Sequence, residues 1–105
     1  MGYAKERVKL EKLSTKVSGL TNYDDKNLTI ITDIFEQYSH AIRILKNKNP
    51  DIFIDQYKNE LEEVKLLKRT LKLSEEADRE DNFQKYRDSL LAALNSAIEI
   101  IKGTA

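Results

Sequence analysis

The sequence predicts an all-α fold: an antiparallel up-down four-helix bundle that forms one domain across residues 1–105. Two observations support this prediction. The chain has one proline and three glycines, and all four lie at the ends or joins of periodic segments. Helix interiors disfavour both residues, because proline lacks an amide proton and glycine loses the most backbone entropy. Between these joins, apolar residues recur every three or four positions, which is the spacing of one helix face.

The first two predicted helices cover residues 3–19 and about 21–47. We expect Gly19 to end the first helix in a left-handed conformation. Thr21 and Asp24, three residues apart, resemble a capping box and predict the start of the second helix. The apolar faces predicted to enter the core are Tyr3, Leu10, Leu13, Val17 and Leu20 on the first helix, and Leu28, Ile31, Ile34, Phe35, Tyr38, Ile42 and Leu45 on the second.

The third predicted helix begins at Asn49-Pro50-Asp51, where asparagine suits the cap and proline suits the first helical position. The fourth starts with Ser74 as its cap and ends before Gly103. The pattern leaves open whether Leu73–Ser74 is a turn or a bend in one long helix, which would give a three-helix bundle. The predicted core faces are Phe53, Tyr57, Leu61, Val64, Leu67 and Leu71, then Phe83, Tyr86, Leu90, Leu94, Ala97, Ile98 and Ile101.

Charge supports this up-down order. Residues 1–23 are net basic and residues 74–105 are net acidic, so the first and last helices should lie side by side and antiparallel. We expect the acidic segment 75–81 near Lys12 and Lys16, and Glu99 near the basic residues of the first turn, Lys5 and Arg7. The alternative is that the same complementarity joins two chains.

Composition restricts the possible classes of function. The chain has 18 basic and 18 acidic residues, so it has no overall field that would attract nucleic acid or an anionic membrane. The absence of cysteine excludes disulfides, thiolate catalysis and sulfur-bound zinc. No segment has the length and apolarity of a membrane span or a signal peptide, so a cytoplasmic location is expected. Frequent Lys, Asn, Ile and Asp residues are typical of proteins from AT-rich bacterial or phage genomes.

Little in the sequence supports catalysis. There is no glycine-rich phosphate loop, no Gly-x-Ser-x-Gly elbow and only one histidine, so we expect no enzyme, no cofactor and no small-molecule substrate. Asp33, Glu36 and His40 lie within two helical turns, but the Glu-x-x-x-His spacing and the lack of a second histidine do not match a di-iron bundle. A solvated polar face explains them better than a metal site.

His40 carries a remote alternative. A small helical bundle with one histidine and basic neighbours, here Arg43 and Lys46, resembles the histidine phosphotransfer domains, which would imply a phospho-acceptor at His40. The chain departs from the His-x-x-Lys-Gly pattern typical of those domains, because it reads His40-Ala41-Ile42-Arg43-Ile44.

A basic stripe marks the second alternative, a nucleic-acid-binding helical protein. Its residues fall on one side of the third helix: Lys58, Lys65, Lys68, Arg69 and Lys72. Such a stripe can follow phosphates, but no aromatic residue interleaves it and the acidic segment 75–81 follows directly. A solvated helix face explains it better.

Several apolar residues lie away from the predicted core faces and favour protein binding instead. Leu66 and Leu73 fall almost opposite the core stripe of the third helix. The other off-face aliphatic residues are Ile30, Ile44 and Ile100, with Val8 and Ile52. A solvated bundle gains nothing from such residues, so they predict a surface for a partner or a second copy. The sequence therefore favours a small non-enzymatic protein–protein interaction module of the phage-accessory, immunity or chaperone kind.

Overall fold

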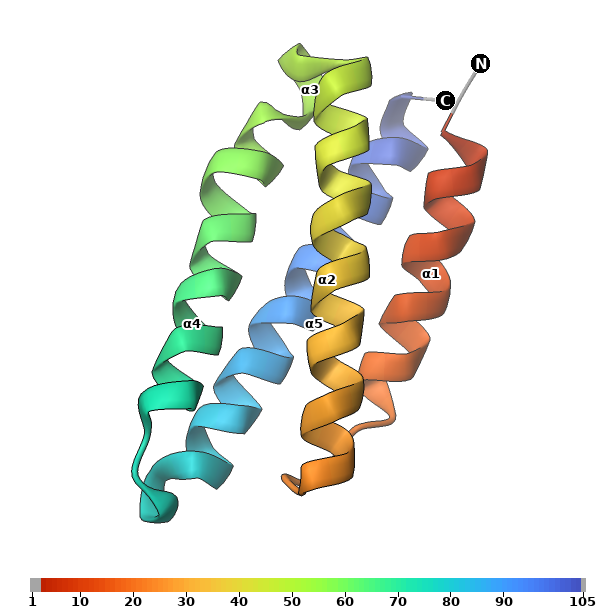
Figure 1. Ribbon diagram of the computed structural model, residues 1–105. Helices are drawn as coiled ribbons and strands as arrows, with labels where there is room; N and C mark the ends of the chain where they lie inside the picture. Colours follow the sequence, from red (N-terminus) through yellow and green to blue (C-terminus); the bar gives the residue numbers. More distant parts are fainter. Residues whose placement is uncertain (1–2, 105) are drawn as a thin grey trace.

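Four helical segments run up and down through the computed structural model, which describes residues 3–104 (Figure 1). They are α1 (Ala4–Ser18), α2 (Asp25–Lys48), a third segment that begins with α3 (Pro50–Asp55) and continues as α4 (Leu61–Leu73), and α5 (Arg79–Thr104). The described residues contain no strand, so the predicted all-α bundle is confirmed. A short 3₁₀ turn, Glu76–Asp78, separates α4 from α5, so the Leu73–Ser74 break is a true turn and the bundle has four segments.

The helix α5 is the central element of the bundle. It packs along α1 on one side and along α4 on the other, while α2 packs on α1 and α3. Figure 1 shows α1 and α4 on opposite sides of the view, with α5 behind and between them. By contrast, the backbones of α2 and α4 lie farther apart than those of the pairs just named, and the long side chain of Lys68 on α4 reaches across to Glu36 on α2. The core is therefore closed around α5, and one seam of the bundle, between α2 and α4, is left open.

The buried residues follow the predicted apolar faces closely. Leu10, Ile31, Phe53 and Leu90, one from each predicted apolar stripe, have no exposed surface. Aromatic edges join neighbouring segments: the ring of Tyr3 lies 5.4 Å from that of Phe53. Burial of these side chains contributes most of the stability of the fold, at roughly 25 cal/mol for each Å² of apolar surface removed from water.

The third segment contains a feature that the sequence pattern did not predict. A π-helical turn, Gln56–Glu60, lies between α3 and α4. Gln56 is five residues before Leu61, and the wide π-turn brings it onto the core side, where it is 2% exposed. Tyr57, which a regular helix would bury, is only half-buried, and Lys46 lies 4.4 Å from the centre of its ring.

Several predicted helix ends differ from the structure. Gly19 has φ −84°, so α1 does not end in a left-handed glycine. The cap of α2 is Asp24, whose carboxylate accepts a hydrogen bond from the Asn27 amide at 2.7 Å, and Thr21 takes no part in it. Asn49 precedes the third segment as predicted, but its side chain makes no capping bond; its backbone carbonyl accepts from Ile52 and Phe53 instead.

Ser74 closes α4 rather than opening α5. Its hydroxyl donates to the Thr70 carbonyl at 2.7 Å and accepts from the Asn82 amide at 2.6 Å. These two bonds fasten the end of α4 to the first turn of α5. A serine that follows a helix can satisfy the last free carbonyls as readily as a serine before a helix satisfies the first amides, and the sequence does not separate the two roles.

The charge argument predicted the right neighbours but the wrong ion pairs. The helices α1 and α5 do pack side by side. Between residues 3 and 104, however, no ion pair links Lys12 or Lys16 to the segment 75–81, or Glu99 to α1. Glu99 pairs with Lys102 at 3.8 Å, within its own helix. Neutral groups join the two helices instead: the Ser14 hydroxyl donates to the Asn95 side chain at 2.8 Å.

Candidate interaction surface

The helix α4 has two faces with opposite character. Leu61, Val64 and Leu71 point into the core and are at most 4% exposed. Leu66 and Leu73 point away from it and are 60% and 75% exposed, which agrees with their positions on the helical wheel. Since they are seven residues apart, they stack two turns apart on one side of the helix. We call Leu66 and Leu73 the α4 leucine strip.

The predicted basic stripe runs beside this strip. Lys65 pairs with Glu62 of the same helix at 3.5 Å, and Lys68 pairs with Glu36 of α2 at 3.4 Å. The Lys68 ammonium also lies 4.8 Å from the centre of the Phe35 ring, so it is the half-buried member of the stripe. The other three residues of the stripe are exposed and form no ion pair within residues 3–104: Lys58, Arg69 and Lys72. Two neighbouring cations at the end of α4, Arg69 and Lys72, are thus available to an outside partner.

The turn after α4 has the opposite charge. Glu75, Glu76 and Asp78 are exposed, and none of them forms an ion pair in the described chain. We call these three residues the acidic turn. The next two carboxylates are already engaged, since Glu80 accepts from the Tyr23 amide at 2.9 Å and Asp81 pairs with Lys85 at 3.2 Å. An unpaired acidic group therefore directly follows an unpaired basic group along the chain.

The remaining residues predicted for a partner surface do not extend the strip. Ile30, Ile44 and Ile100 are half-buried, and Ile30 and Ile100 pack against the core. Ile30 lines a shallow hollow between α1 and α2, which lies on the other side of the bundle from α4. Val8 is 44% exposed on α1.

His40 is exposed on α2 and makes no side-chain hydrogen bond or ion pair with the described residues. The two carboxylates near it in sequence have other partners: Asp33 accepts from Gln37 at 2.7 Å, and Glu36 holds Lys68. Within residues 3–104, no group of three or more His, Cys, Asp or Glu side chains could hold a metal ion.

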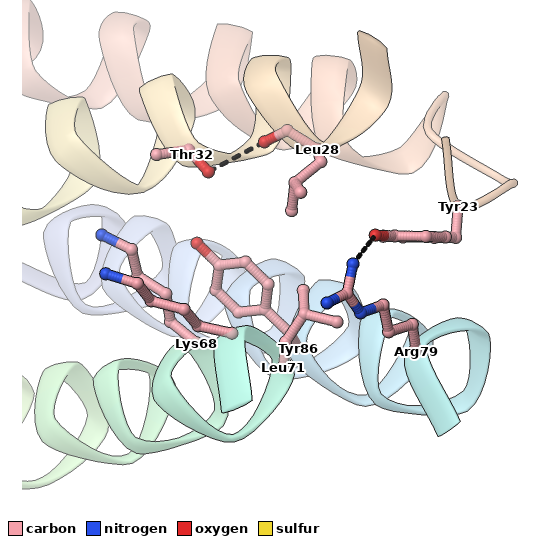
Figure 2. A pocket seen from close by; sticks show the side chains of 8 residues that line it. Tyr23, Leu28, Thr32, Lys68, Leu71, Arg79 and Tyr86 are labelled. Atoms are coloured by element: carbon pink, nitrogen blue, oxygen red, sulfur yellow. Dashed lines mark hydrogen bonds between the residues drawn. The ribbon is translucent and has the colours of Figure 1, made fainter. Parts of the chain in front are cut away.

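The open seam between α2 and α4 forms a groove with a volume of about 490 Å³. Figure 2 shows its walls: Leu28 and Thr32 come from α2, Lys68 and Leu71 from α4, and Tyr86 comes from α5 and lies between them. Lys72 also lines it. At one end, the Arg79 guanidinium donates to the Tyr23 hydroxyl at 3.5 Å, and its Nε donates to the Ser74 carbonyl at 3.4 Å. We call this space the α2–α4 groove.

Tyr86 is the least expected member of the groove. The residue has no exposed surface, yet its hydroxyl has no hydrogen-bond partner in the structure. Figure 2 shows this hydroxyl turned toward α2, between Thr32 and Lys68. Burial, with a smaller effect from the negative charge of Glu36, raises the pKa of Tyr86 well above that of an exposed tyrosine. The hydroxyl is therefore a neutral, unused donor at the groove.

A second polar cluster lies inside the bundle at the π-turn. The Gln56 amide donates to the Ser96 hydroxyl at 2.9 Å and to Glu60, and the Ser96 hydroxyl donates to Glu60 at 3.3 Å. The Gln56 carbonyl oxygen and the Tyr38 hydroxyl remain without partners. Burial, with a smaller effect from Glu60, raises the pKa of Tyr38. The cluster joins the third segment to α5 through side-chain hydrogen bonds.

The sequence pattern predicts Leu28, Leu71 and Tyr86 in the core and Lys68 and Lys72 on a solvated stripe. It gave no sign that these residues share a groove, because a helical wheel shows faces but not the distance between two helices.

Comparison with known proteins finds no matching family model, no matching curated protein and no matching solved structure. Among residues 3–104, no helix combines the length and the apolarity required to cross a bilayer.

Proposed function

We propose that this protein is a non-enzymatic protein–protein interaction module that associates with a second copy of itself through the outer face of α4. The observation that supports the proposal is the α4 leucine strip, with Leu66 and Leu73 exposed 60% and 75% beside two unpaired cations. Isolated exposed aliphatic residues are ordinary on protein surfaces. Two exposed leucines two turns apart on one side of a helix offer two aligned apolar contacts, which association would remove from water.

Charge favours a second copy as the occupant. The unpaired cations Arg69 and Lys72 precede Leu73, and the acidic turn follows it. If two α4 helices cross antiparallel at Leu73, a two-fold axis places the cations of each copy beside the acidic turn of the other. A parallel arrangement would bring the two acidic turns together and is disfavoured by repulsion.

The same crossing also accounts for Leu66. Two turns back along α4, it would lie over the turn of the second copy, where Ala77 is exposed between the acidic residues. The apolar contact is small, so we expect a weak dimer that forms with rising concentration. We propose a cytoplasmic location and a bacterial or phage origin for this module, the origin because the sequence is rich in Lys, Asn, Ile and Asp.

Sedimentation equilibrium over a wide concentration range tests the proposal. The native chain should move from monomer toward dimer, and the double variant Leu66→Lys/Leu73→Lys should remain a monomer with an unchanged melting temperature. Val8→Lys is the matched control, because Val8 is also exposed but lies on α1. It should leave the dimer intact.

A charge exchange tests the orientation. Arg69→Glu should weaken the dimer, and combining it with Glu76→Arg should restore association, since the pair is then reversed rather than broken. The absence of native cysteine allows a second test. Under oxidising conditions Leu73→Cys should form a disulfide-linked dimer, whereas Val8→Cys should not.

Three results would count against this function. A native chain that stays monomeric at every concentration would rule out self-association. A collapsed melting temperature in the leucine double variant, with no change in oligomeric state, would mean that the strip belongs to the core. A salt-dependent shift of nucleic acid, lost on charge reversal of Lys65, Lys68, Arg69 and Lys72, would favour the nucleic-acid alternative.

A further inference from the structure

The α2–α4 groove has the composition of a binding site rather than of a packing defect. A volume of about 490 Å³ lies within the range of small-molecule sites, which extends from about 300 to 1,000 Å³. Its floor and walls are mainly carbon, from Leu28, Leu71 and the ring of Tyr86.

The charged residues at the groove have one sign. Lys68, Lys72 and Arg79 line it, and no carboxylate does so among the described residues. Glu36, just outside, already holds Lys68, and Arg79 is bonded to Tyr23 and Ser74. Lys72 is therefore the cation left free for a ligand, and an anionic group is the complement that the groove lacks.

The Tyr86 hydroxyl is an independent indication of a ligand. A buried hydroxyl without a partner destabilises the folded chain, and such groups are uncommon in native proteins. Its oxygen has less than 1 Å² of exposed surface, so a ligand gains this bond when a neighbouring wall side chain, such as that of Lys68, moves aside. An anionic oxygen at this point would accept from Tyr86 and lie near the two lysines.

We propose that the α2–α4 groove binds a small amphiphilic anion, with an alkyl or aryl body and a single carboxylate. The body lies along Leu28, Leu71 and the Tyr86 ring, toward the end that Arg79 and Tyr23 close (Figure 2). The carboxylate accepts from the Tyr86 hydroxyl and pairs with Lys72. This site shares Lys72 with the proposed dimer contact but not the α4 leucine strip, because Leu66 and Leu73 lie on the outer face of α4 and do not line the groove.

Isothermal titration calorimetry with decanoate, below its micelle concentration, tests the site. Decanoate should bind, whereas acetate lacks the body and decyltrimethylammonium lacks the anionic head, and neither should bind. Tyr86→Phe should weaken decanoate binding about tenfold, which is the usual effect of one hydrogen bond to a charged group. Its melting temperature should stay equal or rise, since the variant removes an unpaired hydroxyl.

Two matched controls complete the test. Tyr38→Phe removes the other unpaired buried tyrosine hydroxyl, which does not line the groove, and should leave decanoate binding unchanged. Lys72→Gln should weaken binding, whereas Lys58→Gln, an exposed lysine outside the groove, should not. The Leu66→Lys/Leu73→Lys variant should still bind decanoate, so the site and the dimer can fail independently.

The proposal is wrong if decanoate and decyltrimethylammonium bind equally, because binding would then be a nonspecific response to alkyl chains. It is also wrong if decanoate does not bind, or if Tyr86→Phe and Lys72→Gln both keep the native affinity.

Discussion

The ammonium of Lys48, at the end of α2, lies 3.3 Å from both carboxylate oxygens of Glu6, in the first turn of α1. Glu6 is 8% exposed, which makes it one of two buried polar residues in the described chain. The pair links two antiparallel neighbours at the end of the bundle where α1 begins. A carboxylate this buried depends on its cation, since a lone charge in a protein interior is strongly disfavoured.

The first prediction concerns this pair. Lys48→Met should lower the free energy of unfolding by about 1–2 kcal/mol, because Glu6 loses its partner while the Lys48 end of the pair is half in solvent. The double variant Glu6→Leu/Lys48→Met should lose less free energy of unfolding than the two single variants lose together, since it leaves no buried charge without a partner. Chemical denaturation of all four proteins measures the coupling. Strictly additive effects would show that the pair is not energetically linked.

The second prediction concerns high pH. Burial raises the pKa values of Tyr38 and Tyr86 above the ordinary value near 10. Above pH 10 the unfolded chain therefore loses these protons while the folded chain keeps them, so stability is full below pH 10 and falls as pH rises. The slope is at most about 1.4 kcal/mol per pH unit for each tyrosine. Denaturation curves between pH 9 and 12 should show this fall, and Tyr38→Phe with Tyr86→Phe should flatten it. An equal fall in the double variant would assign it to other groups.

The third prediction concerns the start of α2. Asp24→Ala should lower the free energy of unfolding by about 1 kcal/mol, because the Asn27 amide loses its acceptor at 2.7 Å. Thr21→Ala is the control and should change it by less than about 0.5 kcal/mol, as for other surface positions. Urea denaturation distinguishes the two. A larger loss for Thr21 would restore the capping box that the sequence suggested.

The fourth prediction concerns Arg87, which joins α5 to the end of α1. Its guanidinium donates to the Leu20 carbonyl at 2.6 Å and to the Ser18 carbonyl at 3.1 Å. Arg87→Met should lower the free energy of unfolding by about 1.5–3 kcal/mol, and Arg87→Lys should recover only part of it, since one ammonium cannot reproduce the planar fork. The exposed Arg43→Met is the control and should have little effect in thermal melts. Full recovery with lysine would show that charge alone matters here.

The helices were predictable because their information is local. The periodicity of Leu10, Leu13 and Val17, and the Asn49-Pro50 start, depend only on residues within a few turns, and the structure agrees with them. Helix ends were less predictable. Asp24 and Thr21 are both acceptable caps by residue type, and only the backbone geometry decides between them. The π-turn was not predicted because Gln56 enters the core against its residue type.

The two candidate sites also differ in whether local sequence information predicts them. The exposure of Leu66 and Leu73 follows from a helical wheel, because it depends on one helix alone. The groove requires three helices at a given distance, and no local pattern reports that α2 and α4 stand apart. The same reason explains the missing ion pairs between α1 and α5. Net charge predicted which helices are neighbours, but the side-chain pairs depend on the rotation of each helix about its axis.

The antiparallel packing of α1 on α5 has a consequence for how the chain can be rewired. The start of α1, at Ala4, and the end of α5, at Thr104, lie at the same end of the bundle, as the two helices in Figure 1 show. A short flexible linker could therefore join the ends, and new ends could be opened in the exposed turn between Glu76 and Ala77. Such a circular permutant would order the segments α5, α1, α2, α3 and α4 along the chain while keeping every helix contact. The place where the chain begins and ends is in this sense a matter of covalent connection rather than of helix packing.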